Sequence, residues 1–394
     1  MRANNMGGAA GATQQNISAQ NMAARNAVLA SAITMIQPTF QQTLTTGLIG
    51  LVLPIQLRNV GLQKRIIIEL QATIANGGAE TQTRTDFGPA NFLSNVTLTD
   101  LSNQQRVNTT GWHLFSLACA RRQLVHGAAY VTDTPCGLGS NYPIMSAPSQ
   151  FVAAGGNQTV RMFYEVPLAY SDFDLRGAIY SNVVNATYQI QLTVNPNFFV
   201  ATGADNTLAV YQSSSAVLGT MSSLTIKIYQ VYLDQIPIVN GGPVLPALDL
   251  STTYILQNTV VSNITANQDN PIPYPNYRQF MSTMAIYDQN GTRNAATDIN
   301  QWKLQVANYT NILNIDPFAQ TLMTRNLLGD DFVKGMYYFD HRHQPINTNQ
   351  WGNMELVINP SSAAASSTVL LGYEMLALAQ QVVQAGSLPG TAGG

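Results

Sequence analysis

The chain has 394 residues, enough for two domains, and its formal net charge of −2 excludes the global basic field typical of nucleic-acid-binding proteins. Only 10% of the residues are charged, against about a quarter in typical soluble proteins. Asn and Gln together outnumber all charged residues. Such a surface suits a protein that packs against copies of itself, and it also suits an ordinary secreted β-protein.

The charges are unevenly distributed along the chain. No Asp or Glu precedes Glu69, whereas five basic residues do: Arg2, Arg25, Arg58, Lys64 and Arg65. One end of the polypeptide is therefore cationic, which fits contact with an anionic surface such as phospholipid headgroups.

The sequence predicts no targeting signal, no transmembrane helix and no disulfide framework. The first residues lack a charged segment followed by an apolar core, so no signal peptide is predicted. No run reaches the ~18 apolar residues of a transmembrane helix. The two cysteines, Cys119 and Cys136, make no disulfide framework. Cys119 is interpreted as a buried thiol, and a disulfide between the two is the alternative.

An N-terminal arm, residues 1–44, is expected before the first domain. Residues 14–36 are predicted to form an amphipathic helix that Pro38 ends. The arm is interpreted as lying on a membrane or a neighbouring subunit. The residues predicted to face that surface are Arg2, Ile17, Met22, Arg25, Val28, Ile33 and Ile36. The alternative is a helix packed on its own domain.

A first β-domain is predicted for residues 45–236, with connections rich in Gly, Asn, Ser, Thr and Pro. From Leu224 to Tyr229 the apolar residues occupy every second position, the period of a half-buried strand. The predicted strands are 47–57, 65–75, 92–100, 159–166, 188–194 and 224–233. One helical insert is predicted at 112–125.

A hinge is predicted at residues 237–247, between the two halves of the chain. Its residues are Pro237, Gly241, Gly242, Pro243 and Pro246. Prolines lack a ladder donor and glycines weaken strand order, so this segment is not expected to continue a sheet.

A second β-domain is predicted for residues 248–380, followed by a Gly-rich tail at 381–394. Its predicted strands are 254–261, 279–288, 300–307, 335–339, 355–359 and 368–376, with a helix near 317–328. Two successive sets of similar strands with few helices favour two β-sandwiches or barrels in tandem.

Two groups of polar residues are candidate sites. His341 and His343 could chelate a metal, but the favoured interpretation is polar loop residues after a strand. Asp172 and Asp174 could serve a glycosidase or a calcium site. A turn with local hydrogen bonds and an ion pair to Arg176 is favoured for these two carboxylates.

Motifs for catalysis or cofactor binding do not emerge. The glycines form no phosphate loop, and neither a Gly-x-Ser-x-Gly elbow nor a His-Glu-x-x-His helix occurs. The aromatic residues alternate within strands, which is typical of sheet packing. The chain is therefore expected to have no enzymatic activity, no cofactor and no bound metal.

Nine segments, in this order and at roughly this spacing, resemble the major capsid protein of tectiviruses, the tailless icosahedral bacteriophages with an internal membrane. They are TDFGPAN (85–91), GWHL (111–114), VPLAYS (166–171), YQVYLDQ (229–235), LDLST (248–252), TDIN (297–300), KGMYY (334–338), GN (352–353) and GYE (372–374). The resemblance covers about 85–374, whereas residues 1–84 match in character more than in letters.

The resemblance implies an all-β fold, a double jelly roll with two tandem eight-stranded jelly rolls and an N-terminal helical arm. It implies a homotrimer whose six barrels form a pseudo-hexagonal capsomer, with neighbouring trimers tiling the icosahedral shell of a virion assembled in the bacterial host cytoplasm. The implied further partners are internal membrane lipids, through the arm, and vertex (penton) and minor capsid proteins. Direct nucleic-acid contact is not expected.

Two other functions are weighed against this structural role. A carbohydrate-binding or carbohydrate-hydrolysing β-sandwich would use Asp172, Asp174 and exposed aromatic residues. A secreted adhesin or pore-forming oligomer would require export, and the missing signal peptide argues against it.

Overall fold

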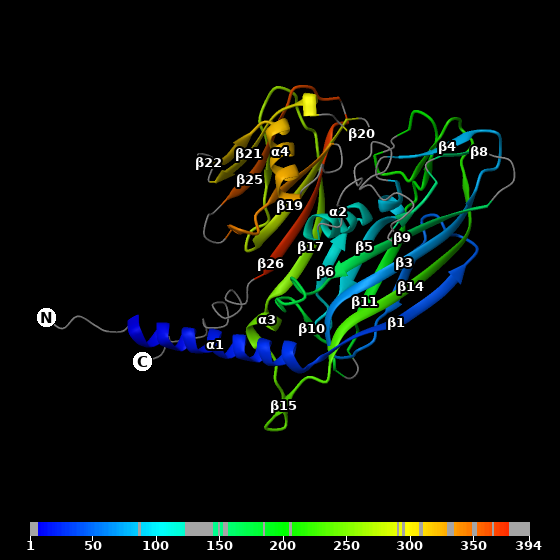
Figure 1. Ribbon diagram of the computed structural model, residues 1–394. Coiled ribbons are helices and arrows are strands. Elements are labelled where there is room, and N and C mark those ends of the chain that lie inside the picture. Colours follow the sequence, from blue (N-terminus) through cyan, green and yellow to red (C-terminus); the bar gives the residue numbers. More distant parts are fainter. Residues whose placement is uncertain are drawn as a thin grey trace, which may run out of the picture.

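The computed structural model describes residues 7–85, 88–122, 145–148, 150–152, 157–183, 186–204, 207–289, 291–293, 296–306, 310–328, 335–348, 353–364 and 366–377. Strands dominate the chain (Figure 1). The four α-helices of this part are α1 (Gly7–Ser31), α2 (Gly111–Arg122), α3 (Ala247–Ser251) and α4 (Pro317–Leu328). Short 3-10 helices span Gly88–Phe92 and Ala296–Asp298.

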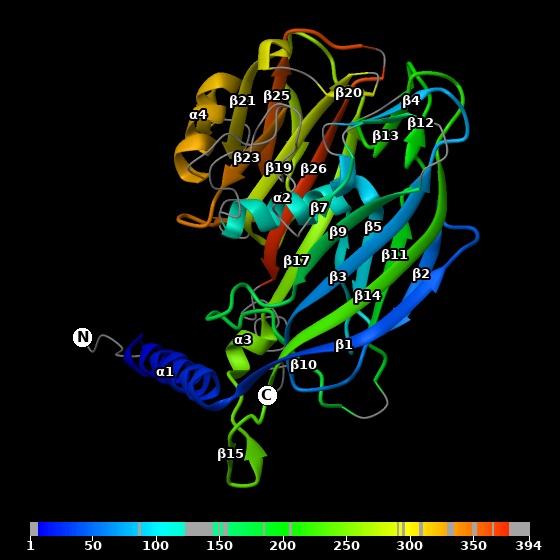
Figure 2. The same cartoon turned by 45° about the vertical axis from the view of Figure 1, so that its right-hand side comes forward.

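The first half of the chain forms two facing sheets. One sheet has the order β1 (Ile33–Leu44), β14 (Thr220–Asp234), β3 (Leu62–Ala75), β9 (Gln158–Pro167) and β7 (Met145–Ser146), and β10 (Ile179–Tyr180) also pairs with β3. The facing strands are β2 (Val52–Gln56), β11 (Gln189–Val194), β5 (Leu93–Thr99) and β6 (Gln105–Thr109). At one end of this half lies a small sheet of β12 (Phe199–Val200), β13 (Tyr211–Ser213), β4 (Thr81–Arg84) and β8 (Gln150–Val152) (Figure 2).

The second half repeats the arrangement. One side contains β17 (Thr253–Ser262), β26 (Thr368–Ala377) and β19 (Gln279–Gln289), with β20 (Thr292–Arg293), β23 (Met336–Asp340) and β24 (Ile346–Asn347) paired to β19. The facing sheet has the order β18 (Asn270–Pro273), β25 (Met354–Pro360), β21 (Ile299–Val306) and β22 (Thr310–Ile315). The fold is therefore the expected double jelly roll, and each predicted strand has a counterpart in the structure.

One continuous sheet joins the two jelly rolls. Strand β6 of the first pairs in parallel with β17 of the second, through Leu256 opposite Val107 and Gln257 opposite Asn108. The sheet that results runs through both halves and has ten strands. Because backbone hydrogen bonds cross the boundary, the two barrels have a fixed relative orientation.

Burial along the strands explains which sheet lies in the middle. In β9 and β11 buried positions alternate, as in strands with one face on a core. In β19 and β26 nearly every residue is buried. One face of these two strands packs in the hydrophobic core of the second jelly roll. Side chains on the other face, such as Met284 and Leu370, belong to the hydrophobic core of the first jelly roll. The boundary between the barrels is thus itself a packed apolar core.

The predicted helix at 14–36 is wrong at its C-terminal end. The helix α1 ends at Ser31, and Ile33–Leu44 forms the strand β1, which pairs antiparallel with β14. The β-branched residues Ile33, Thr34 and Ile36 favour an extended backbone once a partner strand is present. Pro38 does not end a helix; it lies beside a bulge in this edge strand, where a missing donor is tolerated. The described part of the predicted arm, residues 7–44, is therefore a helix followed by a strand of the first jelly roll.

The predicted hinge also differs from the structure. Residues between the two barrels form a two-stranded hairpin of β15 (Ile238–Val239) and β16 (Gly242–Pro243), followed by α3. Asn240 and Gly241 make the turn of this hairpin and Gly242 begins β16, which is how a Gly-rich segment can still carry strand pairing.

Candidate assembly surfaces

The helix α1 is fixed to the body by a cluster of polar contacts with α3. The carboxylate of Asp249 accepts hydrogen bonds from Arg25 Nε at 2.5 Å, Arg25 Nη2 at 2.6 Å and Asn21 Nδ2 at 2.9 Å. The Asn21 side-chain oxygen in turn accepts from the backbone N–H of Leu248 at 2.9 Å. Asp249 is buried, and its hydrogen bond raises the pKa of the Arg25 guanidinium above its ordinary value. We call Asn21, Arg25 and Asp249 the arm latch.

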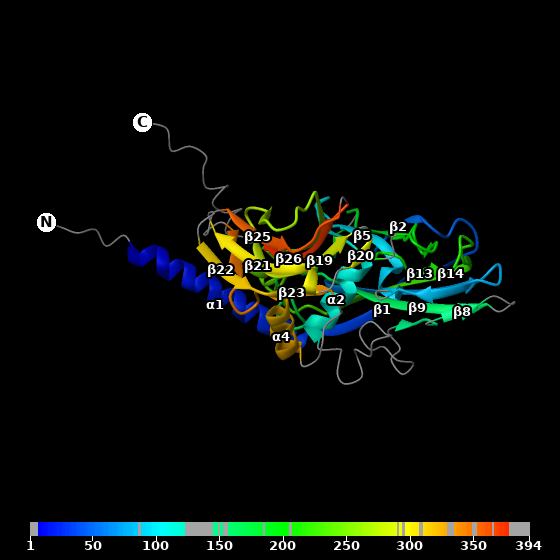
Figure 3. The ribbon, with the colours of Figure 1, turned by 90° about the horizontal axis from the view of Figure 1, so that it is seen from above.

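Apolar packing completes this attachment one turn further along α1. Val28 is fully buried in a small cluster with Leu62, Leu175 and Leu233 of the first jelly roll. The latch and Val28 therefore fix the C-terminal turns of α1, and the rest of the helix extends away from the barrels (Figures 1 and 3).

The residues predicted to face a membrane or a neighbour separate into three groups. Arg25 and Val28 contact their own chain, because Asp249 supplies the charge partner and the Leu62 cluster supplies an apolar site. Ile17 and Met22 are 46% and 59% exposed on α1. Ile33 and Ile36 are also exposed, but they lie on β1. Arg2 lies outside the described residues.

The hinge residues lie at the same end of the molecule as α1. Gly241 is at the tip of the hairpin, Gly242 and Pro243 form β16, and Pro237 accepts a hydrogen bond from the Val244 N–H at 2.8 Å. Pro246 is the N-cap of α3. Figure 1 shows the hairpin projecting from the base of the body. Ile238 and Val239 on it are 71% and 60% exposed.

A buried polar network joins the two jelly rolls beside the shared sheet. The Thr109 hydroxyl donates to Asn258 Oδ1, so His113 Nδ1–H donates to Thr109 Oγ1 at 2.6 Å. His113 comes from α2 of the first jelly roll, and Asn258 from β17 of the second. Burial lowers the pKa of His113 to about 4, so the ring is neutral at neutral pH.

An ion pair lies further along α2. Arg121 donates to the fully buried carboxylate of Glu374 on β26, which also accepts from Ser282 Oγ at 2.7 Å. The Arg121 guanidinium lies 5.0 Å from the ring centre of Tyr170 and 5.1 Å from that of Tyr254. Burial opposes the charge on Arg121, but Glu374, Tyr254 and Tyr170 together outweigh burial and raise the pKa of the guanidinium. The pair links the domains with the carboxylate of Glu374 fully buried, whereas the Arg121 side chain keeps 15% of its surface exposed.

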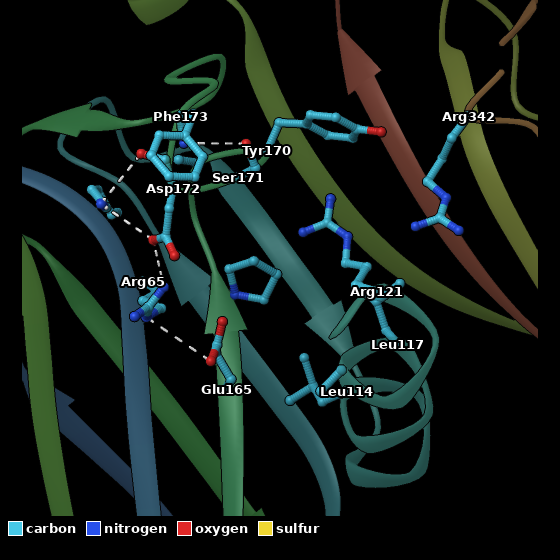
Figure 4. Close-up of a pocket in the computed structure, with 14 residues that line it drawn as sticks. Arg65, Leu114, Leu117, Arg121, Glu165, Tyr170, Ser171, Asp172, Phe173 and Arg342 are labelled. Atoms are coloured by element: carbon cyan, nitrogen blue, oxygen red, sulfur yellow. Dashed lines mark hydrogen bonds and ion pairs between the residues drawn. The ribbon is translucent and has the colours of Figure 1, made fainter. Parts of the chain in front are cut away.

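A cavity of about 280 Å³ opens beside Arg121 (Figure 4). On one wall Asp172 accepts from Arg65 Nη1 at 2.6 Å and pairs with Lys64 at 3.2 Å. On another wall Arg342 pairs with Asp340 at 2.6 Å. The basic groups that line the cavity thus each pair with a carboxylate of the same chain, and the pairs made by Asp172 hold the loop at 168–176.

The favoured interpretation, a turn with local hydrogen bonds and an ion pair to Arg176, is confirmed for Asp174 and is wrong for the partner of Asp172. Asp174 accepts four hydrogen bonds from Arg176, at 2.7 to 3.1 Å, and the Asp174 N–H donates to Ser171 Oγ at 3.0 Å. Burial opposes ionisation of Asp174, but the Arg176 contacts outweigh it and lower the pKa of the carboxyl. Asp172 is paired instead with Arg65 and Lys64, so the two carboxylates face different partners.

The structure gives no support to a metal site at the two candidate histidines. His341 and His343 follow β23 in a bend, and burial lowers the pKa of His341 to about 4. Within the described part of the chain, no three His, Cys, Asp or Glu side chains gather closely enough to hold a metal ion. Cys119 is buried, as expected, whereas Cys136 lies outside the described residues. Among the helices of that same part, none is long and apolar enough to cross a membrane.

No sequence pattern marks Asn21, His113 or Asp249 as an individual residue with a role. Asp249 lies 224 positions from Arg25, so no local pattern joins them. One signal was available: Arg25 is the only charged residue within 14–36, and a lone charge on a docked helix requires a partner.

Comparison with known proteins gives matches over nearly the whole chain. Residues 4–236 match the family described as P3 major capsid protein N-terminal, and residues 251–390 match the P3 major capsid protein C-terminal family. The chain is 36% identical over 380 residues to the major capsid protein P3 of Enterobacteria phage PRD1, covering 96% of each.

Solved structures resemble the fold at much lower identity. The crystal structure of the STIV MCP has a TM-score of 0.63 at 13% identity and covers 90% of this chain and 100% of its own. A chain from the atomic structure of Sulfolobus Turreted Icosahedral Virus has a TM-score of 0.62 at 15% identity, with 90% and 94% covered. These two structures support the double jelly-roll fold. The family matches and the PRD1 relative also support a role as a major capsid protein.

Proposed function

The chain belongs to the P3 major capsid protein family, and from this premise we propose that three copies associate into a pseudo-hexagonal capsomer that tiles an icosahedral shell over an internal membrane. The protein is a structural component of a phage virion, as its PRD1 relative is a major capsid protein. The comparisons favour this role over a carbohydrate-active β-sandwich, since they match capsid proteins throughout.

The observation that carries the proposal is the fixed pairing of two similar barrels in one chain. Because β6 pairs with β17 and a packed core lies between the halves, each chain is one rigid block with two lobes. Three such blocks around a threefold axis present six lobes, an outline with approximate sixfold symmetry. Flexibly linked barrels could not hold that outline from copy to copy.

The division of the chain into domains is part of this proposal. The first jelly roll extends to residue 236 and the second begins at about 248, with the hairpin segment 237–247 between them. The family matches support the division, because one ends at residue 236 and the other begins at 251.

Contacts outside the capsomer are assigned to exposed apolar side chains at the base and edge. Ile17 and Met22 project from α1, so this helix is proposed to lie against membrane lipids or a neighbouring trimer. Ile33 and Ile36 on the edge strand β1 are proposed to face another subunit. Pseudo-hexagonal units cannot fill fivefold positions, so vertex and minor capsid proteins are proposed as further partners.

We assign no catalytic role to the protein. The polar groups most suited to one, at Asp172, Asp174 and the cavity beside Arg121, are held in ion pairs within the chain. The activity proposed is self-association.

The test is the mass of the purified full-length protein in solution. Sedimentation equilibrium at micromolar concentration should give three times the chain mass of 42.6 kDa, and negative-stain images should show hexagonal outlines. A monomer that stays monomeric at that concentration, or a dimer or tetramer, would overturn the trimer proposal.

A further inference from the structure

The hairpin β15–β16 is a small element whose turn residues match its geometry. Ile238 pairs with Pro243 and Val239 with Gly242. The two residues of its turn, Asn240 and Gly241, have φ of +53° and +80°, the left-handed pair that tight two-residue hairpins require. The hairpin leaves the base of the body beside α3 and points away from both jelly rolls (Figures 1 and 2).

The exposed surface of the hairpin is apolar on both faces. Ile238 and Val239 are consecutive in a strand, so their side chains point to opposite faces of the ribbon. Both are exposed, at 71% and 60%. The segment 235–248 contains no charged residue. The acidic groups that flank it are Asp234, exposed at the end of β14, and Asp249, which is held in the arm latch.

We propose that the tip of this hairpin inserts into the headgroup and upper acyl region of a lipid bilayer. A medium that surrounds the tip can cover both of its faces at once, whereas a subunit surface would cover one and leave the other in water. The uncharged segment removes the cost of desolvating an ion on entry. The polar backbone of the Asn240-Gly241 turn keeps insertion shallow, because it requires hydrogen-bond partners.

This inference deepens the proposed function, since it adds a second membrane contact beside α1. One hairpin exposes too little apolar area for tight binding by a single chain. Many identical tips on one closed shell would act together, so that weak contacts add into firm attachment. The hairpin and α1, which carries the exposed residues Ile17 and Met22, lie at the same end of the molecule, where one bilayer could meet both.

The experiment places an environment-sensitive nitrobenzoxadiazole label on the tip of the full-length protein. The variant Val239→Cys is made in a Cys136→Ser background, in which the other cysteine, Cys119, is buried. Vesicles of phosphatidylethanolamine and phosphatidylglycerol in equal parts are added. The label emission should rise severalfold and shift to the blue, and a nitroxide near the headgroup should quench it more than one near the acyl end.

A matched control uses Val217→Cys in the same background. Val217 is likewise an exposed valine, at 51%, but it lies beyond the opposite end of β14 from the hairpin. Its label should not respond to vesicles. An unchanged signal at residue 239, or an equal response at both positions, would overturn the inference. If the label emission at residue 239 rose with protein concentration in the absence of lipid, the inference would also be overturned. The hairpin tip would then contact a second copy of the chain.

A charged residue placed at the tip of the hairpin tests the inference independently of the label. The variant Ile238→Lys should lower the vesicle partition coefficient about tenfold, because one apolar side chain is lost and a charge is added. Unchanged partition of Ile238→Lys would contradict the inference.

The pair Ile17→Lys and Met22→Lys tests the arm in the same assay. Failure of the hairpin leaves the arm result and the sedimentation mass intact, so it is distinguishable from failure of the proposed function.

Discussion

The ring of His113 lies so close to Gly372 that a Cβ on residue 372 would come within 2.5 Å of it. His113 belongs to α2 of the first jelly roll, and Gly372 to β26 of the second. The ring is fully buried and bonded to Thr109, so it cannot move aside. The boundary between the two barrels therefore has no room for a side chain at residue 372.

The first prediction concerns that contact. Gly372→Ala should destabilise the protein by about 1–3 kcal/mol, because a methyl group is forced into a packed boundary. The measurement is guanidinium unfolding, followed by far-UV circular dichroism. The matched control is Gly77→Ala, where a Cβ meets nothing within 4 Å and the stability should stay unchanged. Equal midpoints for both variants would show that the barrels tolerate a wider spacing.

The second prediction is a loss of stability in mild acid. Burial lowers the pKa of His113 from 6.5 to about 4, so between these values the unfolded chain binds a proton that the folded chain does not. The free energy of unfolding should therefore fall as the pH falls from 6.5 to 4, by about 3 kcal/mol for this residue. His341, whose pKa is lowered to about 4 as well, acts in the same direction.

The variant His113→Asn isolates this effect. Its amide can still donate to Thr109 Oγ1, but it does not titrate. Thermal or denaturant unfolding at several pH values should then give a shallower slope between pH 6.5 and 4 than the unchanged protein gives. If the variant and the unchanged protein gave the same slope, His113 would contribute nothing to the difference in bound protons between the unfolded and the folded chain.

The third prediction concerns the arm latch. Arg25→Ala leaves the buried carboxylate of Asp249 without its cation, so α1 should detach and its amides at 21–31 should exchange at least tenfold faster. The measurement is hydrogen exchange followed by mass spectrometry. Asp249→Ala and the double variant complete a cycle, with an expected coupling energy of about 1–3 kcal/mol. Strictly additive effects would mean that the pair contributes no mutual stabilisation.

The fourth prediction separates the role of the arm in assembly from its role in folding. Deleting residues 1–20 keeps Asn21, Arg25 and Val28 but removes Ile17 and the turns that extend from the body. Trimers should form with unchanged melting temperature, and the yield of closed shells on a density gradient should drop. Normal shell yield would remove this part of α1 from assembly.

The comparison for this truncation is deletion of residues 1–32, which also removes Val28. The cluster around Leu62 and Leu233 is then opened to water, at a cost of about 2 kcal/mol. A lower melting temperature is therefore expected for this longer deletion alone.

Much of the fold could be predicted because half-buried strands have a simple period. In β14 apolar residues recur at every second position from Leu224 to Ile228, and the buried side chains follow the same alternation. The helix α4 was likewise predicted at its observed position, 317–328. Errors arose where the period was ambiguous. Ile33 and Ile36 fit one face of a helix, and only the partner strand β14, far away in the chain, makes that segment extended.

The sequence alone determined the class of the protein, through two sets of alternating strands, few charges and the nine capsid-like segments. These are local properties, because strand period and turn chemistry act between near neighbours. The tertiary structure decided which side chains meet. Arg25 points toward its own chain because its Nε atom binds the Asp249 carboxylate at 2.5 Å. The two residues are 224 positions apart in the sequence. His113 reaches Gly372 because strand pairing and packing join the barrels, although the two residues are far apart in the chain. Such contacts join distant segments, and folding alone brings them together.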